Sequence, residues 1–324
     1  MFFFITCLRA LAACLITNTH YGSIYPSSSM AVGGLLGDVI FFAVSGFCLF
    51  NVKFNFFKWY GKRLYRIYPS VIIITVIYFC FGFYSFSEGK SFFWWFVYPT
   101  NFHFIASIIF LYIPFYIVSK IKFTRNHLWL VMGCVAVIYL IIYIFFYDKS
   151  FYRVDFVDEP MIRFIFFESM LLGAWFRNNI GKFQNKFSWL SVAMLIVSSI
   201  AYFGTKIFFS KFGLLLAFQC INQLTLFVLL FSLLWLFTGI DQLLEKLPKT
   251  IKKVIDFISK LTLEIYLVQS VLIRLISPIG FPWNFIAVTA SIIIAAYLLH
   301  LICKGFYFLC DKSVKLLKNK WRKE

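Results

Sequence analysis

An arginine and a histidine, Arg9 and His20, lie eleven positions apart in the first hydrophobic segment of the chain. In a regular helix this spacing equals about three turns, so both side chains leave one face with roughly 16 Å of axial rise between them. Imidazole titrates near neutral pH and can act as a general base, whereas a guanidinium binds anionic groups. Ionisable residues inside a membrane span are costly and usually functional. The pair therefore predicts a reaction site within a membrane protein.

The composition of the chain indicates a membrane protein. Hydrophobic residues make up 62% of the 324 residues, and the mean hydropathy is +0.86. Most of the long apolar runs approach or exceed the length of a bilayer crossing, and a backbone in hydrocarbon must satisfy its own hydrogen bonds, so we expect helices. The ten expected segments are 2–21, 35–50, 67–84, 97–118, 128–147, 162–176, 188–204, 212–238, 261–277 and 284–303. The predicted fold class is an all-α integral membrane protein with about ten transmembrane helices.

The positions of lysine and arginine predict the orientation of these segments, because cytoplasmic loops retain positive charge. With the N-terminus in the cytoplasm, 23 of the 31 Lys and Arg residues fall on the cytoplasmic side, six fall outside, and Arg9 and Arg274 lie within spans. Both termini are therefore expected in the cytoplasm. We expect residues 1–304 to form a single transmembrane domain and residues 305–324 to form a basic cytoplasmic tail.

The net charge of +18 is scattered over five membrane-proximal stretches instead of being gathered on one domain. This distribution favours anionic membrane lipids as partners and argues against nucleic acid. The eight cysteines form no C-x-x-C pair and the four histidines do not cluster. We therefore expect neither a metal site nor a disulfide framework.

The second hydrophobic segment carries one acid and one pair of small residues, Asp38 and Ser45-Gly46. Asp38 is a candidate buried acid. Small residues let another helix or a ligand approach the backbone closely, and the sequence leaves both alternatives open for Ser45 and Gly46.

Two arginines, Arg63 and Arg66, precede the third hydrophobic segment. Residues three apart project to one side of a helical turn, and two guanidiniums together suit a polyanion such as a phosphate group. Pro69 is expected in the first turn of the third span, where its missing N–H costs nothing. The alternative for the two arginines is an ordinary positive-inside cluster.

Four short motifs occur in a fixed order along these segments. They are Arg9-x10-His20, Phe41-Phe42-x-x-Ser45-Gly46, Arg63-x-x-Arg66-Ile67-x-Pro69 and Tyr266-Leu267-Val268-Gln269. In this order and topology, over nearly the whole chain, they resemble the membrane-bound acyltransferase-3 family, of the polysaccharide O-acetyltransferase type.

The resemblance implies transfer of an acyl group, commonly acetyl from cytoplasmic acetyl-CoA, to a hydroxyl of a bacterial cell-surface polysaccharide or its lipid-linked precursor. It implies a multi-pass protein of the bacterial inner (cytoplasmic) membrane. The family's essential arginine and histidine fall on Arg9 and His20. His20 is expected to act as base or as acyl carrier, and Arg9 on the donor side. The candidate cofactor-binding residues are Arg63, Arg66, Ser45 and Gly46.

Two other classes of membrane protein are alternatives. A glycan transporter or flippase would also use intramembrane charges, but it predicts repeated halves and broken helices. A polysaccharide polymerase would be expected to carry a large external loop, whereas the longest one expected here, about 148–161, is modest.

The chain departs from the family pattern at two positions. Many relatives carry an acid where Val39 stands, one position after Asp38, so a family-derived role for Asp38 is doubtful. Gln269 replaces the histidine of many members, which removes a second catalytic histidine there. Three further charges within spans are expected to line the cavity or pair internally: Glu168, Glu264 and Arg274. The remaining histidines are expected to be structural: His103, His127 and His300.

Overall fold

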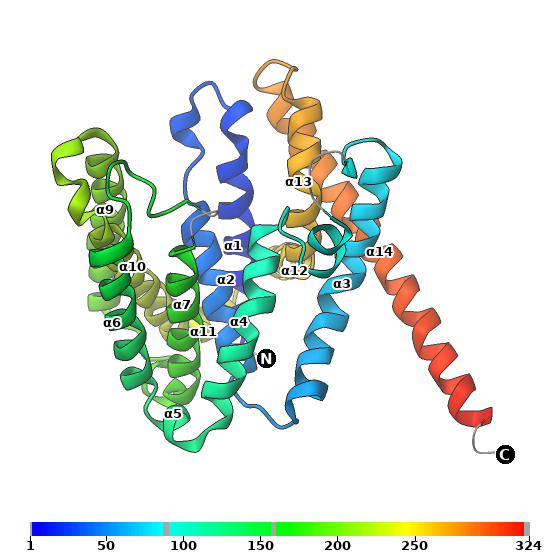
Figure 1. The fold of residues 1–324 in the computed structure, drawn as a ribbon, viewed down its shortest axis with the longest axis horizontal. Helices are drawn as coiled ribbons and strands as arrows, with labels where there is room; N and C mark the ends of the chain where they lie inside the picture. The colour runs from blue at the N-terminus through cyan, green and yellow to red at the C-terminus, as the bar shows by residue number, and fades with distance from the viewer. Residues whose placement is uncertain (1, 87–90, 157–159, 321–324) are drawn as a thin grey trace. The chain divides into compact units, whose positions relative to one another are not determined.

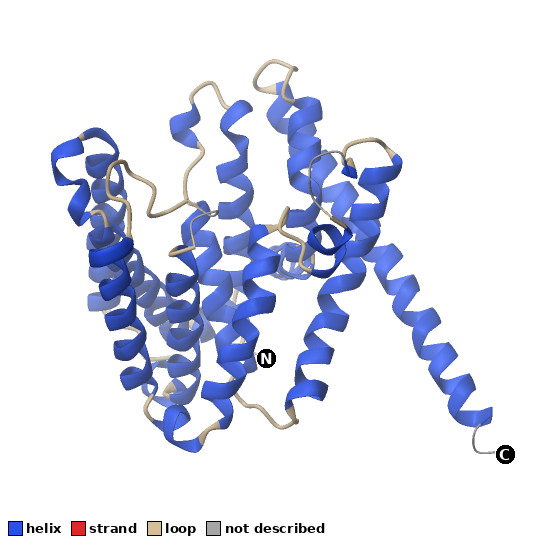
Figure 2. Cartoon of the chain, in the orientation of Figure 1, coloured by secondary structure: helices blue, strands red, loops and turns tan. Residues whose placement is uncertain are grey.

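The computed structural model describes residues 2–86, 91–156 and 160–320, and within these ranges the chain is helical with no strand (Figure 2). Each of the ten expected hydrophobic segments overlaps a helix. Eight of the described helical segments are long and apolar enough to cross a membrane. The helices at the other two positions, α7 (Ile162–Asn178) and α13 (Thr262–Ile276), have 17 and 15 residues. The prediction of an all-α, multi-pass membrane protein is confirmed.

The helices follow one another along the chain as labelled in Figure 1. Besides α7 and α13, they are α1 (Phe3–His20), α2 (Gly34–Leu49), α3 (Phe56–Cys80), α4 (His103–Lys120), α5 (Lys122–Asn126), α6 (Leu128–Phe146), α8 (Ile180–Phe183), α9 (Trp189–Lys211), α10 (Cys220–Gly239), α11 (Asp241–Glu245), α12 (Lys249–Lys260) and α14 (Trp283–Lys320). Short turns of tighter or wider helix are η1 (Tyr21–Ser23), η2 (Ser28–Met30), η4 (Phe93–Val97) and η5 (Gly213–Phe218).

The chain divides into two compact units. The first unit comprises residues 1–16, 33–59 and 103–259, and the second comprises residues 17–32, 60–102 and 260–324. Helix α1 contributes its first part to the first unit and its last turn to the second. The predicted domain boundary at residue 304 lies inside α14, which continues to Lys320.

In the first unit, α2 and α7 pack with their backbones in direct contact. A Cβ atom added to Gly46 of α2 would lie 1.9 Å from the carbonyl oxygen of Met170, and one added to Gly173 of α7 would lie 1.8 Å from that of Ala43. Both glycines are therefore required by the crossing, since no side chain fits between the two backbones. Phe42 and Phe166 are the nearby aromatic pair, stacked with ring centroids 4.4 Å apart.

In the second unit, α14 buries one stripe and exposes an apolar opposite side. The buried side chains recur every three or four residues: Val288, Ile292, Ala296, Leu299 and Cys303. The exposed ones include Ile286, Ile294, Leu298 and Ile302. This pattern suits a helix that packs on protein along one side and faces hydrocarbon along the other.

Helix α3 begins earlier than the hydropathy pattern predicts. It starts at Phe56 instead of residue 67, because the side chain of Asn55 caps it by accepting a hydrogen bond from the Lys58 amide at 3.1 Å. Pro69 therefore lies inside the helix, and its predicted place in the first turn is wrong.

Candidate functional site

His20 is the last residue of α1, and its side chain is exposed. The chain then tightens into η1 and loops back toward α2. The imidazole thus stands at the end of a membrane-spanning helix instead of being buried in its middle. The role of His20 as base or acyl carrier stays a prediction.

Two side chains near His20, those of Thr17 and Tyr21, are held by hydrogen bonds within the second unit. The Thr17 hydroxyl donates to Gln269 Oε1 at 2.9 Å, and Gln269 is only 1% exposed. The hydroxyls of Tyr21 and Thr289 are 3.0 Å apart. These contacts tie the last turn of α1 to α13 and α14, so the backbone around His20 is fixed from two sides.

Asn18 ties the following loop to the same turn. Its amide nitrogen donates to the carbonyl oxygens of Met30 and Val32 at 3.1 and 2.9 Å. Its side-chain oxygen accepts a hydrogen bond from the Tyr25 hydroxyl at 2.7 Å. The loop between α1 and α2 is therefore folded back onto the segment that carries His20.

The late motif, residues 266–269, is anchored a second time by α3. The Tyr78 hydroxyl donates to the carbonyl oxygens of Leu267 and Val268 at 3.2 and 3.3 Å. Gln269, the last residue of this motif, supports the last turn of α1 through its hydrogen bond to Thr17. Its hydrogen bond to Thr17 was not predicted from the sequence, where Gln269 entered only as a replacement for a family histidine.

The two arginines of the third motif lie on α3, Arg63 partly buried and Arg66 exposed. Their spacing of three on a continuous helix places them on one side of it, as predicted. The carbonyl oxygens of Tyr65 and Arg66 accept hydrogen bonds from the Tyr307 hydroxyl of α14 at 3.2 and 3.3 Å. The sequence did not predict this contact of Tyr307. Its one signal is Pro69, which has no amide hydrogen to donate to the carbonyl of Tyr65 four residues earlier.

Glu264 is paired inside the second unit. Its Oε1 lies 3.1 Å from Nδ1 of His300, and the side chains are 8% and 27% exposed. One turn further along α14, the Cys303 sulfur lies 3.3 Å from the hydroxyl of Ser70 on α3. Of the two alternatives for Glu264, the structure shows internal pairing, and His300 holds α14 to α13.

The other predicted residues belong to the first unit. Arg9 lies partly buried on α1, whose first turn is capped where the Phe4 amide donates to Asp241 Oδ1 at 2.9 Å. Ser45 is partly buried on α2. At Gly46 the close neighbour is another helix, since the α7 backbone occupies the space beside it. A role for Ser45 and Gly46 in cofactor binding stays a prediction.

Two acids are buried in the first unit, Asp38 on α2 and Glu168 on α7, at 6% and 8% exposure. Glu168 Oε1 makes no hydrogen bond within the described part of the chain. In the same part, no group of three His, Cys, Asp or Glu side chains could hold a metal ion.

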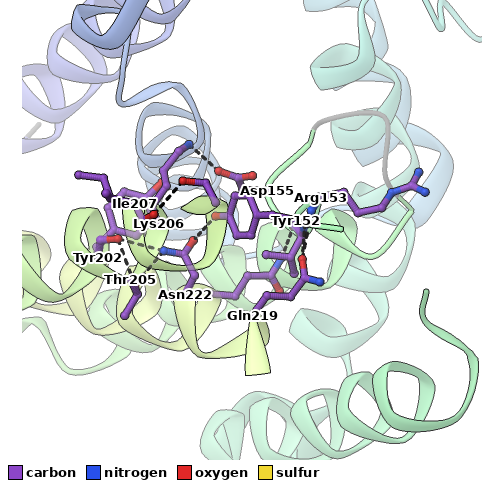
Figure 3. Close-up of polar contacts among 12 residues, drawn as sticks. Tyr152, Arg153, Asp155, Tyr202, Thr205, Lys206, Ile207, Gln219 and Asn222 are labelled. Atoms are coloured by element: carbon purple, nitrogen blue, oxygen red, sulfur yellow. Dashed lines mark hydrogen bonds and ion pairs between the residues drawn. The ribbon is translucent and has the colours of Figure 1, made fainter. Parts of the chain in front are cut away.

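A cluster of polar contacts that the sequence did not predict joins the segment after α6 to α9 and α10 (Figure 3). Lys206 Nζ lies 2.5 Å from Asp155 Oδ2. Asn222 accepts from the Tyr152 hydroxyl at 3.1 Å and donates to the Thr205 hydroxyl at 3.0 Å. The side chain of Gln219 accepts from the amides of residues 153 and 154 at 3.0 and 3.2 Å. Because its polar groups are largely satisfied, this cluster stabilises the fold of the first unit.

The fold and these residues define a polytopic membrane protein with an exposed histidine at the end of one span and a pair of arginines on another. The chain belongs to the acyltransferase-3 family, because the family profile described as "Acyltransferase domain" matches residues 2–304. It is therefore a multi-pass membrane acyltransferase. Comparison with curated proteins and with solved structures finds no match.

Proposed function

We propose that the protein transfers acetyl from cytoplasmic acetyl-CoA to a hydroxyl of a bacterial cell-surface polysaccharide or its lipid-linked precursor, in the bacterial cytoplasmic membrane. The observation that carries the proposal is the exposed His20 on a turn fixed by the Thr17–Gln269 hydrogen bond. A general base must be accessible to the substrate and held in place. Family membership supplies acyl transfer as the reaction class.

The chemistry balances with His20 as general base. The imidazole takes the proton of the sugar hydroxyl while the oxygen attacks the thioester carbonyl, and an oxyanion forms. Collapse breaks the carbon–sulfur bond, the acetyl ester forms, and the proton passes to the thiolate of CoA. In the alternative, His20 attacks the thioester carbonyl and CoA leaves as its thiolate; the acetyl-imidazole then passes the acetyl group to the sugar oxygen, and the hydroxyl proton goes to the thiolate.

The donor side of the proposal rests on Arg63, Arg66 and Arg9. Guanidinium groups bind phosphates through two parallel N–H bonds, and acetyl-CoA carries several phosphate groups. Arg63 and Arg66 on α3 would hold these phosphates, and Arg9 on α1 would hold a phosphate or the pantetheine arm of the donor. Ser45 and Gly46 complete the candidate donor residues.

The test compares His20→Ala with His127→Ala in a deletion strain, with matched expression of both proteins. His127 is a matched control because it lies between α5 and α6, outside the four motifs in the sequence, and its Nδ1 is 2.9 Å from the carbonyl oxygen of Phe123. We expect loss of O-acetyl groups from the surface glycan for His20→Ala and none for His127→Ala. Unchanged acetylation in His20→Ala would refute the catalytic assignment.

Binding of labelled acetyl-CoA to purified protein tests the donor. We expect Arg63→Ala and Arg66→Ala to weaken binding by about tenfold or more each, since a hydrogen bond to a charged group contributes about 1.5–3 kcal/mol. Arg125→Ala, on the short helix α5, serves as the control. Absence of binding by the unaltered protein would refute acetyl-CoA as the donor.

A further inference from the structure

Pro69 creates an unsatisfied acceptor in the middle of α3. In an α-helix each amide donates to the carbonyl four residues earlier, and proline has no amide hydrogen. The carbonyl oxygen of Tyr65 therefore loses its helical donor. This carbonyl lies between Arg63 and Arg66 in the chain, so the defect falls inside the arginine motif.

Tyr307 supplies the missing donor from α14. Its hydroxyl lies 3.2 Å from the carbonyl oxygen of Tyr65 and 3.3 Å from that of Arg66. The rings of Tyr65 and Tyr307 are also in contact, with centroids 5.1 Å apart. The hydroxyl therefore gives the carbonyl of Tyr65 the hydrogen-bond donor that the proline removes.

The position of Tyr307 along α14 is itself fixed. Tyr307 lies four residues, or about one turn, after Cys303, which is buried on the packed side of α14. Cys303 contacts Ser70, the residue after Pro69. Two consecutive turns of α14 thus contact α3 on both sides of the proline. These contacts hold α14 against the stretch of α3 that contains the proline.

We infer that Tyr307 is a positioning residue for the arginine pair: its hydroxyl holds the turn of α3 that presents Arg63 and Arg66 to the acyl donor. The inference rests on the proposed function for the identity of the donor. The hydroxyl of Tyr307 contacts only backbone oxygens in these hydrogen bonds, and its ring contacts that of Tyr65, so it acts on the arginines through the turn of α3 that carries them. Its loss weakens donor binding and leaves the chemical step at His20 unchanged.

The test is a double-mutant cycle between Tyr307→Phe and Pro69→Ala. Tyr307→Phe keeps the ring and removes the hydroxyl, whereas Pro69→Ala restores the amide that the carbonyl of Tyr65 lacks. We expect Tyr307→Phe to raise the Kd and KM for acetyl-CoA by about threefold to tenfold with kcat unchanged, as for one lost hydrogen bond. In the Pro69→Ala background the same change should have little effect. Tyr143→Phe, which removes a 2.9 Å bond to the carbonyl oxygen of Ala217, is the matched control.

Amide hydrogen exchange of residues 65–72 gives a second readout that needs no acyl donor. We expect faster exchange in Tyr307→Phe and not in the double variant. Equal exchange and equal affinity in Tyr307→Phe and the unaltered protein, or equal losses in both backgrounds, would overturn the inference. Failure of the unaltered protein to bind acetyl-CoA would instead overturn the proposed function, and exchange would still decide the role of Tyr307.

Discussion

The hydroxyl of Thr17 lies 2.9 Å from Oε1 of Gln269, one helical turn before His20. This contact joins the end of the first span to a motif about 250 residues later in the chain. Gln269 is buried, and through this hydrogen bond it holds the last turn of α1, which carries His20.

Thr17→Val and Gln269→Ala are each expected to lower the acetyl-transfer rate by about threefold to tenfold, because either change removes the same hydrogen bond. The double variant should lose little more than the single ones, since the two residues act through one contact. Measured kcat values in the four proteins decide this. Losses that multiply in the double variant would show that the two side chains act separately.

Gly46→Ala is expected to destabilise the protein by more than the 1–3 kcal/mol or so typical of overpacking, because the new methyl group would overlap the carbonyl of Met170. Gly133→Ala is the matched control on α6, where nothing lies within 4 Å of the added carbon. That change should stabilise the helix by about 0.5–1 kcal/mol. Thermal unfolding in detergent compares the two, and a tolerated Gly46→Ala would contradict the tight crossing of α2 and α7.

Lys206→Met is expected to cost about 1–3 kcal/mol, because it leaves the Asp155 carboxylate, 3% exposed, without its cation. The cost is at the low end for an ion pair in the interior, since Lys206 is 35% exposed and water screens it. The double variant Lys206→Met/Asp155→Asn should recover part of the loss. Lys211→Met, on the exposed end of α9, is the control. An equal loss in both lysine variants would count against the pair.

Alkaline pH is expected to destabilise the first unit through Tyr152. Burial, and secondly the neighbouring Asp155 carboxylate, raise the pKa of Tyr152 above its ordinary value. The folded protein therefore keeps a proton that the unfolded chain releases near pH 10, and stability falls as the pH rises above about 10. In Tyr152→Phe the unfolding temperature should fall less steeply between about pH 9 and 11. Parallel pH curves for the two proteins would refute this role.

Local patterns were sufficient to locate the helices, because hydropathy reports where a segment must be buried in lipid. They were insufficient where a helix extends past its apolar run: Asn55 starts α3 before the hydrophobic residues begin, and α14 continues beyond residue 304. The sequence predicts Pro69 in the first turn of a helix, because proline is favoured at that position. The structure instead places Pro69 inside α3, with Tyr307 compensating.

The candidate residues themselves were readable from motif spacing, but the groups that support them were not. The hydrogen-bond partners of Thr17 and Glu264 come from helices far away in the chain, so no local window contains both members of a pair. At Gly46 the spacing left open a helix or a ligand, and only the packing of α7 shows which neighbour is there.

Helix α1 runs without interruption from Phe3 to His20, and so Arg9 and His20 are separated by a rod of fixed length and fixed twist. No rearrangement of other helices alters that separation while the α1 hydrogen bonds persist. Only an insertion or a deletion between the two residues does so. One added residue would turn His20 by about 100° relative to Arg9, whereas seven would return it nearly to the same side but about 10 Å further along the axis.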